Sequence, residues 1–146
     1  MALTDEQKTE QARLIREGSA DDCVRFVEEH SPDHVPDADL DLDGFVRRVA
    51  GVGKGHDCFA LAVAADLGGE QAKPLETRIL EEGRGRECAF YATSVHGADF
   101  DALQERIIEK GSVEDIDAFV TIAGGHPDAD FDRLANARGG REGPVA

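Results

Sequence analysis

The sequence predicts an all-α fold in which short helical hairpins stack in tandem. Three observations predict it: an internal repeat of 28 to 35 residues, a single repeat position that holds every cysteine, and apolar residues spaced as on one face of a helix. Cys23, Cys58 and Cys88 are 35 and 30 residues apart, and the same position holds Ile116 after another 28 residues. Repeats of this length are single supersecondary units that bury their apolar faces against their neighbours.

The first helix of each unit carries this cysteine position. A glycine five residues earlier ends the previous helix, because glycine tolerates the positive φ of a C-terminal cap. Ser19 and Ser112 then stand three residues before Asp22 and Asp115, a spacing typical of a capping box. The cysteine position and the positions three and four residues later are small or apolar in every unit, which indicates one buried face. The predicted first helices cover residues 20–30, 56–66, 86–95 and 114–123.

The second helix of each unit ends in the motif Arg-apolar-apolar-x-x-Gly. Counting back from the glycine, apolar residues fall at steps 3, 4, 8 and 11, as in Ile108, Ile107, Leu103 and Phe100, and form one helical stripe. An Ala-Asp-apolar-Asp turn precedes this helix in three units and supplies an aspartate for the N-cap. The predicted second helices cover residues 41–50, 73–82, 99–110 and 130–138, and an opening half-unit covers 5–17.

We therefore predict one α-helical repeat domain over residues 1–138, built as a right-handed stack of four hairpins after an N-terminal half-repeat, with nine short helices. The fourth unit lacks the arginine motif, and residues 139–146 are predicted to form a flexible tail. The pattern resembles the short α-hairpin repeats of the α-solenoid class, with units shorter than tetratricopeptide or HEAT units. Residues 90–103 are similar to tandem helical repeats of uncharacterised bacterial and phage proteins. This resemblance implies a binding scaffold and brings no catalytic residues.

The chain is strongly acidic, with 31 acidic and 16 basic residues among 146 and a net charge of −15. Such a protein repels nucleic acid and anionic membranes, and it favours cations or proteins with a basic surface. The same acidity fits a protein adapted to high salt. Acids on the predicted helix faces are the candidate partner-binding residues: Glu28, Glu29, Glu76, Glu105 and Glu109.

The cellular location is predicted from the terminus and the cysteines. No apolar run reaches the roughly 18 residues of a membrane span, and the N-terminus has no basic-then-apolar signal character. Unpaired thiols fit a reducing compartment, so we expect a cytoplasmic protein. Zinc would require close ligand pairs such as Cys-x-x-Cys, and a disulfide requires Cα atoms within about 7 Å, whereas stacked helices lie roughly 10 Å apart. We therefore expect Cys23, Cys58 and Cys88 to be buried structural thiols.

Two rows of charged residues run in register along the repeat. The arginine row consists of Arg13, Arg48, Arg78 and Arg106. The acidic row, directly before the cysteine position, consists of Asp22, Asp57, Glu87 and Asp115. Two complementary rows predict ion pairs that join consecutive units; the alternative is that the arginines grip a phosphate or an acidic peptide.

Metal ligation is the most specific chemical alternative. Asp39, Asp41 and Asp43 reproduce the opening of an EF-hand loop, but position 12 is Ala50, where calcium requires a bidentate carboxylate. A helix cap is therefore the favoured interpretation of this loop. Three histidines lie in the turns between helices, along one edge of the stack: His34, His96 and His126. Ordinary turn residues are the favoured interpretation, because adjacent units hold these side chains too far apart for one ion; the alternative is a divalent-metal site or a pH sensor.

The leading functional hypothesis is a non-catalytic protein-binding scaffold or inhibitor module, whose acidic surface engages a basic partner. One form of it is a nucleic-acid mimic. We expect no cofactor, no direct nucleic-acid binding and a monomer or homodimer. The chain contains no Gly-x-Ser-x-Gly or P-loop motif. Two alternatives stay open: a divalent-metal or calcium-binding helical protein, and an enzyme whose site is assembled across repeats.

Overall fold

The computed structural model describes residues 2–32 and 36–142, and over these residues it contains nine α-helices and no strand. The predicted all-α fold with nine helices is confirmed. The predicted boundaries agree with the observed ones to within one or two residues except at the C-terminus. The helices are α1 (Asp5–Glu17), α2 (Ala20–Glu29), α3 (Leu42–Val52), α4 (Gly55–Ala64), α5 (Lys73–Glu82), α6 (Gly85–Ser94), α7 (Phe100–Lys110), α8 (Val113–Ala123) and α9 (Phe131–Glu142).

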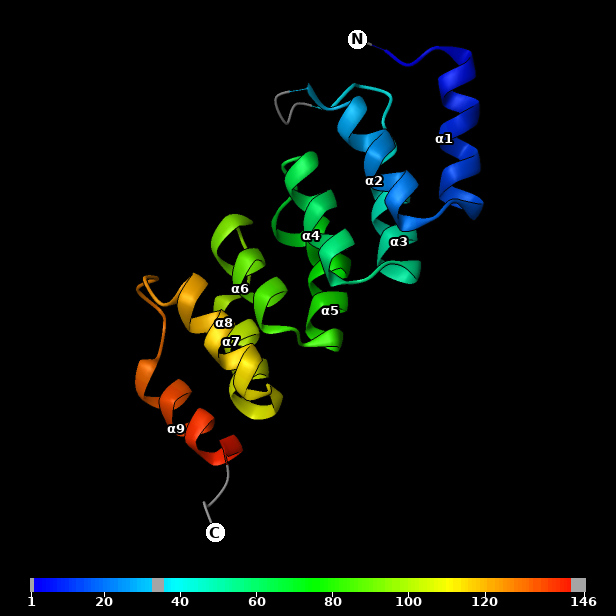
Figure 1. The fold of residues 1–146 in the computed structure, drawn as a ribbon. Helices are drawn as coiled ribbons and strands as arrows, with labels where there is room; N and C mark the ends of the chain where they lie inside the picture. The colour runs from blue at the N-terminus through cyan, green and yellow to red at the C-terminus, as the bar shows by residue number, and fades with distance from the viewer. Residues whose placement is uncertain (1, 33–35, 143–146) are drawn as a thin grey trace.

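The helices follow one another along a single direction, with the two ends of the chain at opposite ends of the molecule (Figure 1). Every pair of helices in substantial contact is one or two positions apart in the chain. The even-numbered helices therefore form one row and the odd-numbered helices a second row. Such near-neighbour packing is what tandem repeats require, since each unit buries its apolar face only against the adjacent units. The right-handed α-solenoid stays a prediction.

Short polar side chains begin most of the helices. The hydroxyl of Ser19 accepts a hydrogen bond from the Asp22 N–H at 3.1 Å, and Ser112 and Asp115 form a reciprocal capping box. At α4 and α6 the acceptor comes instead from another helix. Glu82 accepts from the Gly55 N–H at 2.7 Å, and Asp115 accepts from the Gly85 N–H at 2.9 Å.

The core is one continuous seam between the two rows. The cysteine position lies at its centre, since Cys23, Cys58, Cys88 and Ile116 are all buried. The position three residues later holds the large side chain that fills the space beside it. In α6 this side chain is Tyr91, whose buried hydroxyl donates to the Ala72 carbonyl at 3.3 Å.

The C-terminal boundary differs from the prediction. Helix α9 continues to Glu142, so residues 139–142 are helical and do not belong to a flexible tail. Arg141 explains the extension, because its guanidinium donates to the carbonyls of Gly111 at 3.0 Å and Ile108 at 2.6 Å. The fourth unit thus has its arginine at position 141, one helical turn after Ala137, where the repeat motif would place it. Residues 143–146 lie outside the described residues.

Candidate functional site

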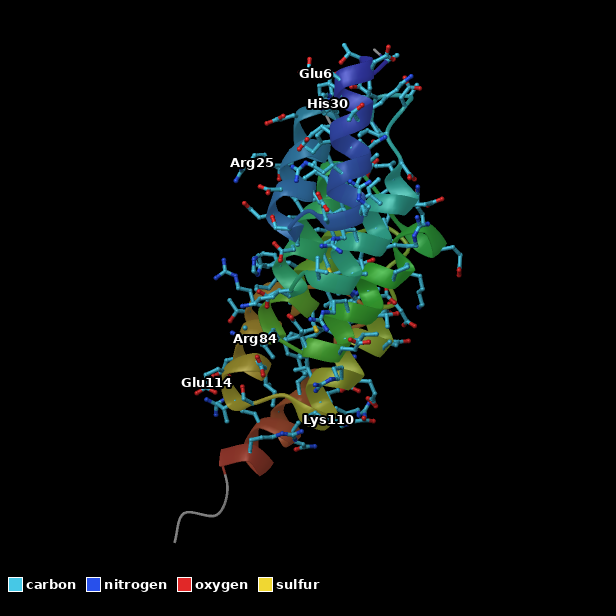
Figure 2. The ribbon with its side chains drawn as sticks, turned by 90° about the vertical axis from the view of Figure 1, so that its right-hand side faces the viewer. Glu6, Arg25, His30, Arg84, Lys110 and Glu114 are labelled. Atoms are coloured by element: carbon cyan, nitrogen blue, oxygen red, sulfur yellow. The ribbon has the colours of Figure 1, made fainter. Side chains whose placement is uncertain are left out.

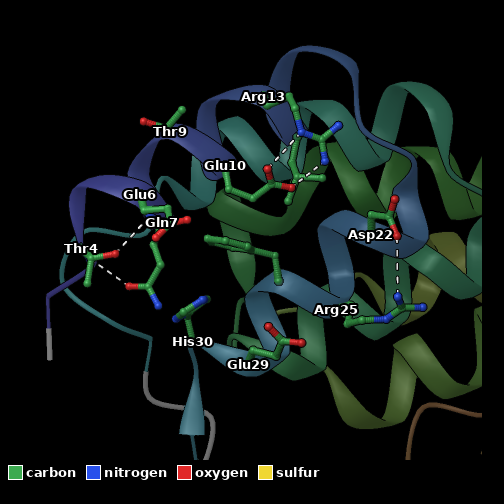
Figure 3. A pocket seen from close by; sticks show the side chains of 12 residues that line it. Thr4, Glu6, Gln7, Thr9, Glu10, Arg13, Asp22, Arg25, Glu29 and His30 are labelled. Carbon is green, nitrogen blue, oxygen red and sulfur yellow. Dashed lines mark hydrogen bonds and ion pairs between the residues drawn. The ribbon is translucent and has the colours of Figure 1, made fainter.

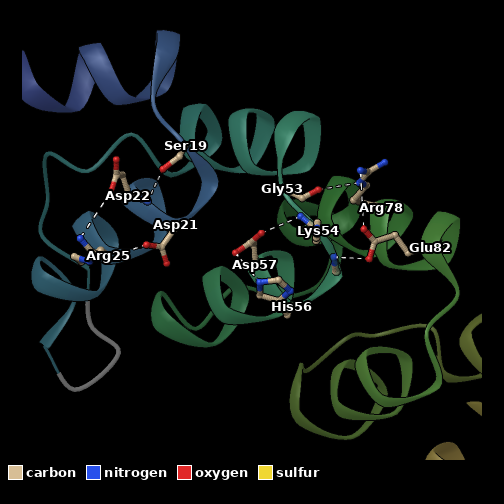
Figure 4. A network of polar contacts seen from close by, with 11 residues as sticks. Ser19, Asp21, Asp22, Arg25, Gly53, Lys54, His56, Asp57, Arg78 and Glu82 are labelled. Atoms are coloured by element: carbon tan, nitrogen blue, oxygen red, sulfur yellow. Dashed lines mark hydrogen bonds and ion pairs between the residues drawn. The ribbon is translucent and has the colours of Figure 1, made fainter. Parts of the chain in front are cut away.

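The arginine row joins the odd-numbered helices through backbone carbonyls. Arg48 Nε donates to the Gly18 carbonyl at 2.8 Å. Figure 4 shows the equivalent bond from Arg78 Nε to the Gly53 carbonyl, at 3.0 Å. Arg106 Nε donates to the Leu80 carbonyl at 2.9 Å in the same way. These three arginines therefore satisfy the C-terminal end of the preceding odd-numbered helix, where free carbonyls and the helix dipole favour a cation.

The predicted ion pairs between the arginine row and the acidic row are wrong. Within the described ranges, the acids instead cap the even-numbered helices or contact other cations: Asp57 accepts from the Lys54 N–H at 2.9 Å, and Asp22 lies 3.8 Å from Arg25. Burial opposes ionisation of Asp115, but hydrogen bonds from Gly85 and Ser112 outweigh it and hold the pKa of its carboxyl below the usual value. The arginines of α3, α5 and α7 thus join units through backbone carbonyls, and Asp115 joins α8 to α6 through the Gly85 N–H.

A second polar row was missed by the sequence reasoning. We call Gln11, Glu76 and Gln104 the clamp residues; they are buried, and each accepts a hydrogen bond from the N–H of the aspartate that caps the next odd-numbered helix. Gln104, for example, accepts from Asp130 at 2.8 Å and donates to the Asp128 carbonyl at 3.3 Å.

A sequence signal for the clamp existed. A Gln or Glu stands two residues before the arginine in these three units, and Val46 replaces it in the one unit whose next turn lacks the Ala-Asp motif.

The predicted acidic binding face does not form one surface. Glu76 is only 3% exposed and belongs to the clamp, so it is not available to a partner. Glu105 makes a bidentate ion pair with Arg133. Glu28 and Glu29 lie on α2 in the even row, whereas Glu105 and Glu109 lie on α7 in the odd row. Figure 2 also shows Arg25, Arg84 and Glu114 along one side of the stack, so that side carries both signs of charge.

The metal candidates occupy structural positions. Asp41 is the N-cap of α3 and accepts from the Gly44 N–H at 3.0 Å, while Asp39 lies 3.7 Å from Lys8 and Asp43 is exposed in the first turn. The EF-hand-like spacing is therefore a helix start. Across residues 2–32 and 36–142, no three His, Cys, Asp or Glu side chains converge as metal ligands.

The turn histidines are partly brought together. His96 and His126 line one cavity of about 380 Å³, and His34 lies outside the described residues. The ring of His126 stacks on Phe100 with centroids 4.0 Å apart, and its Nδ1 accepts from the Asp128 N–H at 3.1 Å. His126 therefore acts as a packing and turn-forming group.

The cysteines are free and buried, as the repeat predicts. Burial raises the pKa of the Cys58 and Cys88 thiols to about 12. A thiol with so high a pKa is protonated at neutral pH and is a poor nucleophile or metal ligand. These side chains serve the core.

A groove of about 970 Å³ lies at the N-terminal end of the stack, between α1 and α2 (Figure 3). We call it the N-terminal groove. Gln7 and Glu10 line it at steps 11 and 8 before Gly18, where the later units have apolar residues. Arg13 has no preceding carbonyl to bond and instead donates to Glu10 at 3.0 Å. Most of the side chains that line this groove are polar or charged, and among them Arg13 pairs with Glu10.

A smaller groove of about 420 Å³ lies at the other end, between α8 and α9, and we call it the C-terminal groove. It is mostly apolar, with Val120 and Ile116 from α8 and Leu134 from α9. Phe131 stands at its edge with 54% of its surface exposed, whereas Phe100, at the equivalent position of the previous unit, is 6% exposed. Phe100 is buried because Phe119 of α8 and His126 of the following turn cover it.

One half of the C-terminal groove is closed by charge. Arg138 Nε donates to Asp117 at 2.6 Å and joins α9 to α8. Asp117 stands where α6 has the buried Ala89, and Arg138 stands where α7 has the buried Ile107. The hydrogen bond from Arg138 lowers the pKa of the Asp117 carboxyl, so the pair is ionised at neutral pH. The other half, around Phe131 and Val120, is left apolar and open.

Comparison with known proteins adds no relative to this picture, since no family model, curated protein or solved structure matches the chain. None of the helices in the described ranges has the length and hydropathy of a membrane-spanning segment.

Proposed function

We propose that this protein is a non-catalytic protein-binding module that docks a partner in the C-terminal groove. The observation that carries the proposal is the exposure of Phe131, at 54%, in a position that the preceding unit keeps buried. An exposed apolar patch with a polar edge marks an interaction site, and aromatic side chains supply much of the energy of such sites. The repeat architecture supports the proposal because stacked helices present rigid, extended binding surfaces.

The charge of the chain suggests a basic partner. The net charge of −15 attracts positively charged proteins over several Å and raises their association rate. Near the groove, Asp132 is exposed on α9. A protein whose nucleic-acid site is basic fits this description, so a nucleic-acid mimic is one form of the proposed module.

The proposal is tested by affinity capture from a native lysate with wild-type protein, Phe131→Asp and Val52→Asp. Val52 is the matched control, because it is 49% exposed on α3, outside both grooves. We expect a partner that wild type and Val52→Asp retain and Phe131→Asp loses. The captured protein is then purified, and its affinity is measured by calorimetry with all three variants.

A loss of at least tenfold in affinity, confined to Phe131→Asp, supports the C-terminal groove as the docking surface. Equal capture by all three variants contradicts it, as does equal loss in both mutants. Thermal unfolding of each variant shows whether the substitution disturbs the fold.

A further inference from the structure

We infer that the occupant of the C-terminal groove is a single basic amphipathic helix, which lies on α8 and α9 as α8 lies on α6 and α7. The inference rests on the proposed function and specifies the partner of the same site. It names the form, the apolar pattern and the charge of the segment that binds.

The inner units supply the template for the form. Helix α8 buries Ile116, Phe119 and Ala123 on one face, a spacing of three and then four residues. Phe119 reaches Phe100 with ring centroids 5.7 Å apart. Phe131 occupies the place of Phe100 in the next unit, so the same helical pattern on a partner would cover it.

Residues at the end of the stack also limit the length over which the partner helix contacts α8 and α9. Gly85 lets α8 approach α6 closely, because a Cβ at Gly85 would lie 2.0 Å from the Asp115 carbonyl oxygen. At the end of the stack the equivalent residue is Val113, whose side chain prevents that approach. The Asp117–Arg138 pair covers the adjacent part of the groove. The partner helix therefore seats on the half where Phe131 is exposed and Val120 is partly exposed, over the buried Leu134.

The charge of the helix follows from the groups around this half. The cations nearby are already engaged: Arg138 bonds to Asp117, Arg133 to Glu105, and Arg141 to backbone carbonyls. Asp132 has no hydrogen bond or ion pair within the described part of the chain. Lysine or arginine flanking the apolar stripe would pair with it, whereas an acidic helix would be repelled.

A second copy of this chain fits the groove less well. It would bring together two chains that each carry a net charge of −15. Its own N-terminal end would present Glu10 and Arg13 to the apolar residues. Burying such a pair against an apolar surface costs free energy unless its hydrogen bonds are replaced. Charge thus favours a different, basic protein.

A synthetic peptide tests the inference directly. The probe has the sequence of residues 112–123 with Glu114→Lys, Asp117→Lys and Thr121→Lys, so that it keeps the buried stripe of α8 and carries a basic outer face. Fluorescence anisotropy measures its binding to the full-length protein. The matched peptide has the unchanged acidic sequence, and a third peptide adds Ala118→Pro to the basic one, which breaks the helix.

We expect the basic peptide to bind wild type and Val52→Asp equally and to bind Phe131→Asp at least tenfold more weakly. The acidic peptide and the proline peptide are each expected to bind at least tenfold more weakly than the basic peptide. Asp132→Lys is expected to weaken the basic peptide and to strengthen the acidic one, because the local charge is reversed. The unfolding temperatures of the variants control for the fold.

Several outcomes overturn the inference. Equal binding of the basic and proline peptides excludes the helical form, and equal binding to Phe131→Asp excludes the groove. Sedimentation that shows a Phe131-dependent dimer identifies a second copy as the occupant. If no peptide binds while lysate capture still depends on Phe131, the helical occupant is wrong and the docking function stands; if capture is independent of Phe131, the docking function itself is wrong.

Discussion

The two ends of the stack solve the same problem differently. Each end leaves open a surface between an odd-numbered and an even-numbered helix. In the inner units, a further even-numbered helix covers this surface. At the N-terminal end the positions that would face this helix are Gln7 and Glu10, and Arg13 pairs with Glu10 along α1. At the C-terminal end Phe131 keeps the apolar residue of the inner units.

The difference shows which end is adapted to water alone. A repeat array requires polar terminal surfaces to remain soluble, and the N-terminal groove meets this requirement along its length. The C-terminal groove meets it only where Asp117 and Arg138 form their ion pair. Asp117 and Arg138 replace apolar residues of the inner units, whereas Phe131 keeps one. The apolar half around Phe131 is therefore better explained by the proposed partner than by the needs of the fold.

The largest expected effect on stability is the difference between alanine substitutions of the two equivalent phenylalanines, Phe100 and Phe131. Phe100→Ala is expected to lower the free energy of unfolding by about 3–5 kcal/mol, because it removes a buried ring between Phe119 and His126. Phe131→Ala is expected to change it by less than about 0.5 kcal/mol, since half of that ring is already in water. Urea unfolding of the two variants measures both values. Similar losses would mean that Phe131 belongs to the core and is not a free docking residue.

The next effect concerns how closely the inner helices pack. Gly85→Ala is expected to cost about 1–3 kcal/mol in unfolding free energy, because the added Cβ would meet the Asp115 backbone at the seam between α6 and α8. Gly51→Ala is the matched control: Gly51 lies in α3, a Cβ there meets nothing within 4 Å, and alanine favours the helix by about 0.4–1 kcal/mol. If both substitutions stabilise the protein, the close seam does not exist, and Val113 would not restrict the C-terminal groove.

The clamp residues give an effect of similar size, at both ends of the stack. Gln104→Ala and Gln11→Ala are each expected to cost about 1–3 kcal/mol, because the N–H of Asp130 or Asp41 loses its buried partner. Gln71→Ala, at an exposed position in the turn before α5, is the control and is expected to change stability by less than about 0.5 kcal/mol. Chemical unfolding checks all three. An effect at one clamp and none at the other would show that the two ends of the odd row are not held alike.

The fold was predictable because its signals are local. Glycine follows α1, α3, α5, α7 and α8, and serine or aspartate precedes α2, α3, α7 and α8. These residues fix the boundaries locally, and the cysteine position fixes the phase of the repeat. The partners of the charged rows were not predictable in the same way. An arginine and an acid in register look complementary in sequence, yet Arg78 reaches the Gly53 carbonyl because the preceding helix ends beside it in space.

The candidate site was partly readable and partly not. The polar residues at steps 8 and 11 of the first helix can be seen in the sequence, as can the clamp two residues before each arginine. Glu76 was expected on a binding face because a glutamate followed by Thr77 and Arg78 looks exposed, and only the packing of α5 against the turn before Asp99 shows that it is buried. The exposure of Phe131 could not be predicted from sequence, because it depends on how the helices pack in the folded stack.

The smallest expected change in stability converts the N-terminal end into a copy of the C-terminal one. The double substitution Gln7→Leu and Glu10→Leu removes a capping contact to Thr4 and an exposed ion pair, and is expected to leave the midpoint of unfolding nearly unchanged. It is nevertheless expected to cause concentration-dependent self-association in sedimentation experiments, because both ends of the stack then expose apolar grooves. Thr77→Leu with Glu81→Leu, on the exposed face of α5, controls for added apolar surface. A monomer in both cases would mean that the polar residues of the N-terminal groove are not what keeps that end free, and the contrast with Phe131 would lose its force.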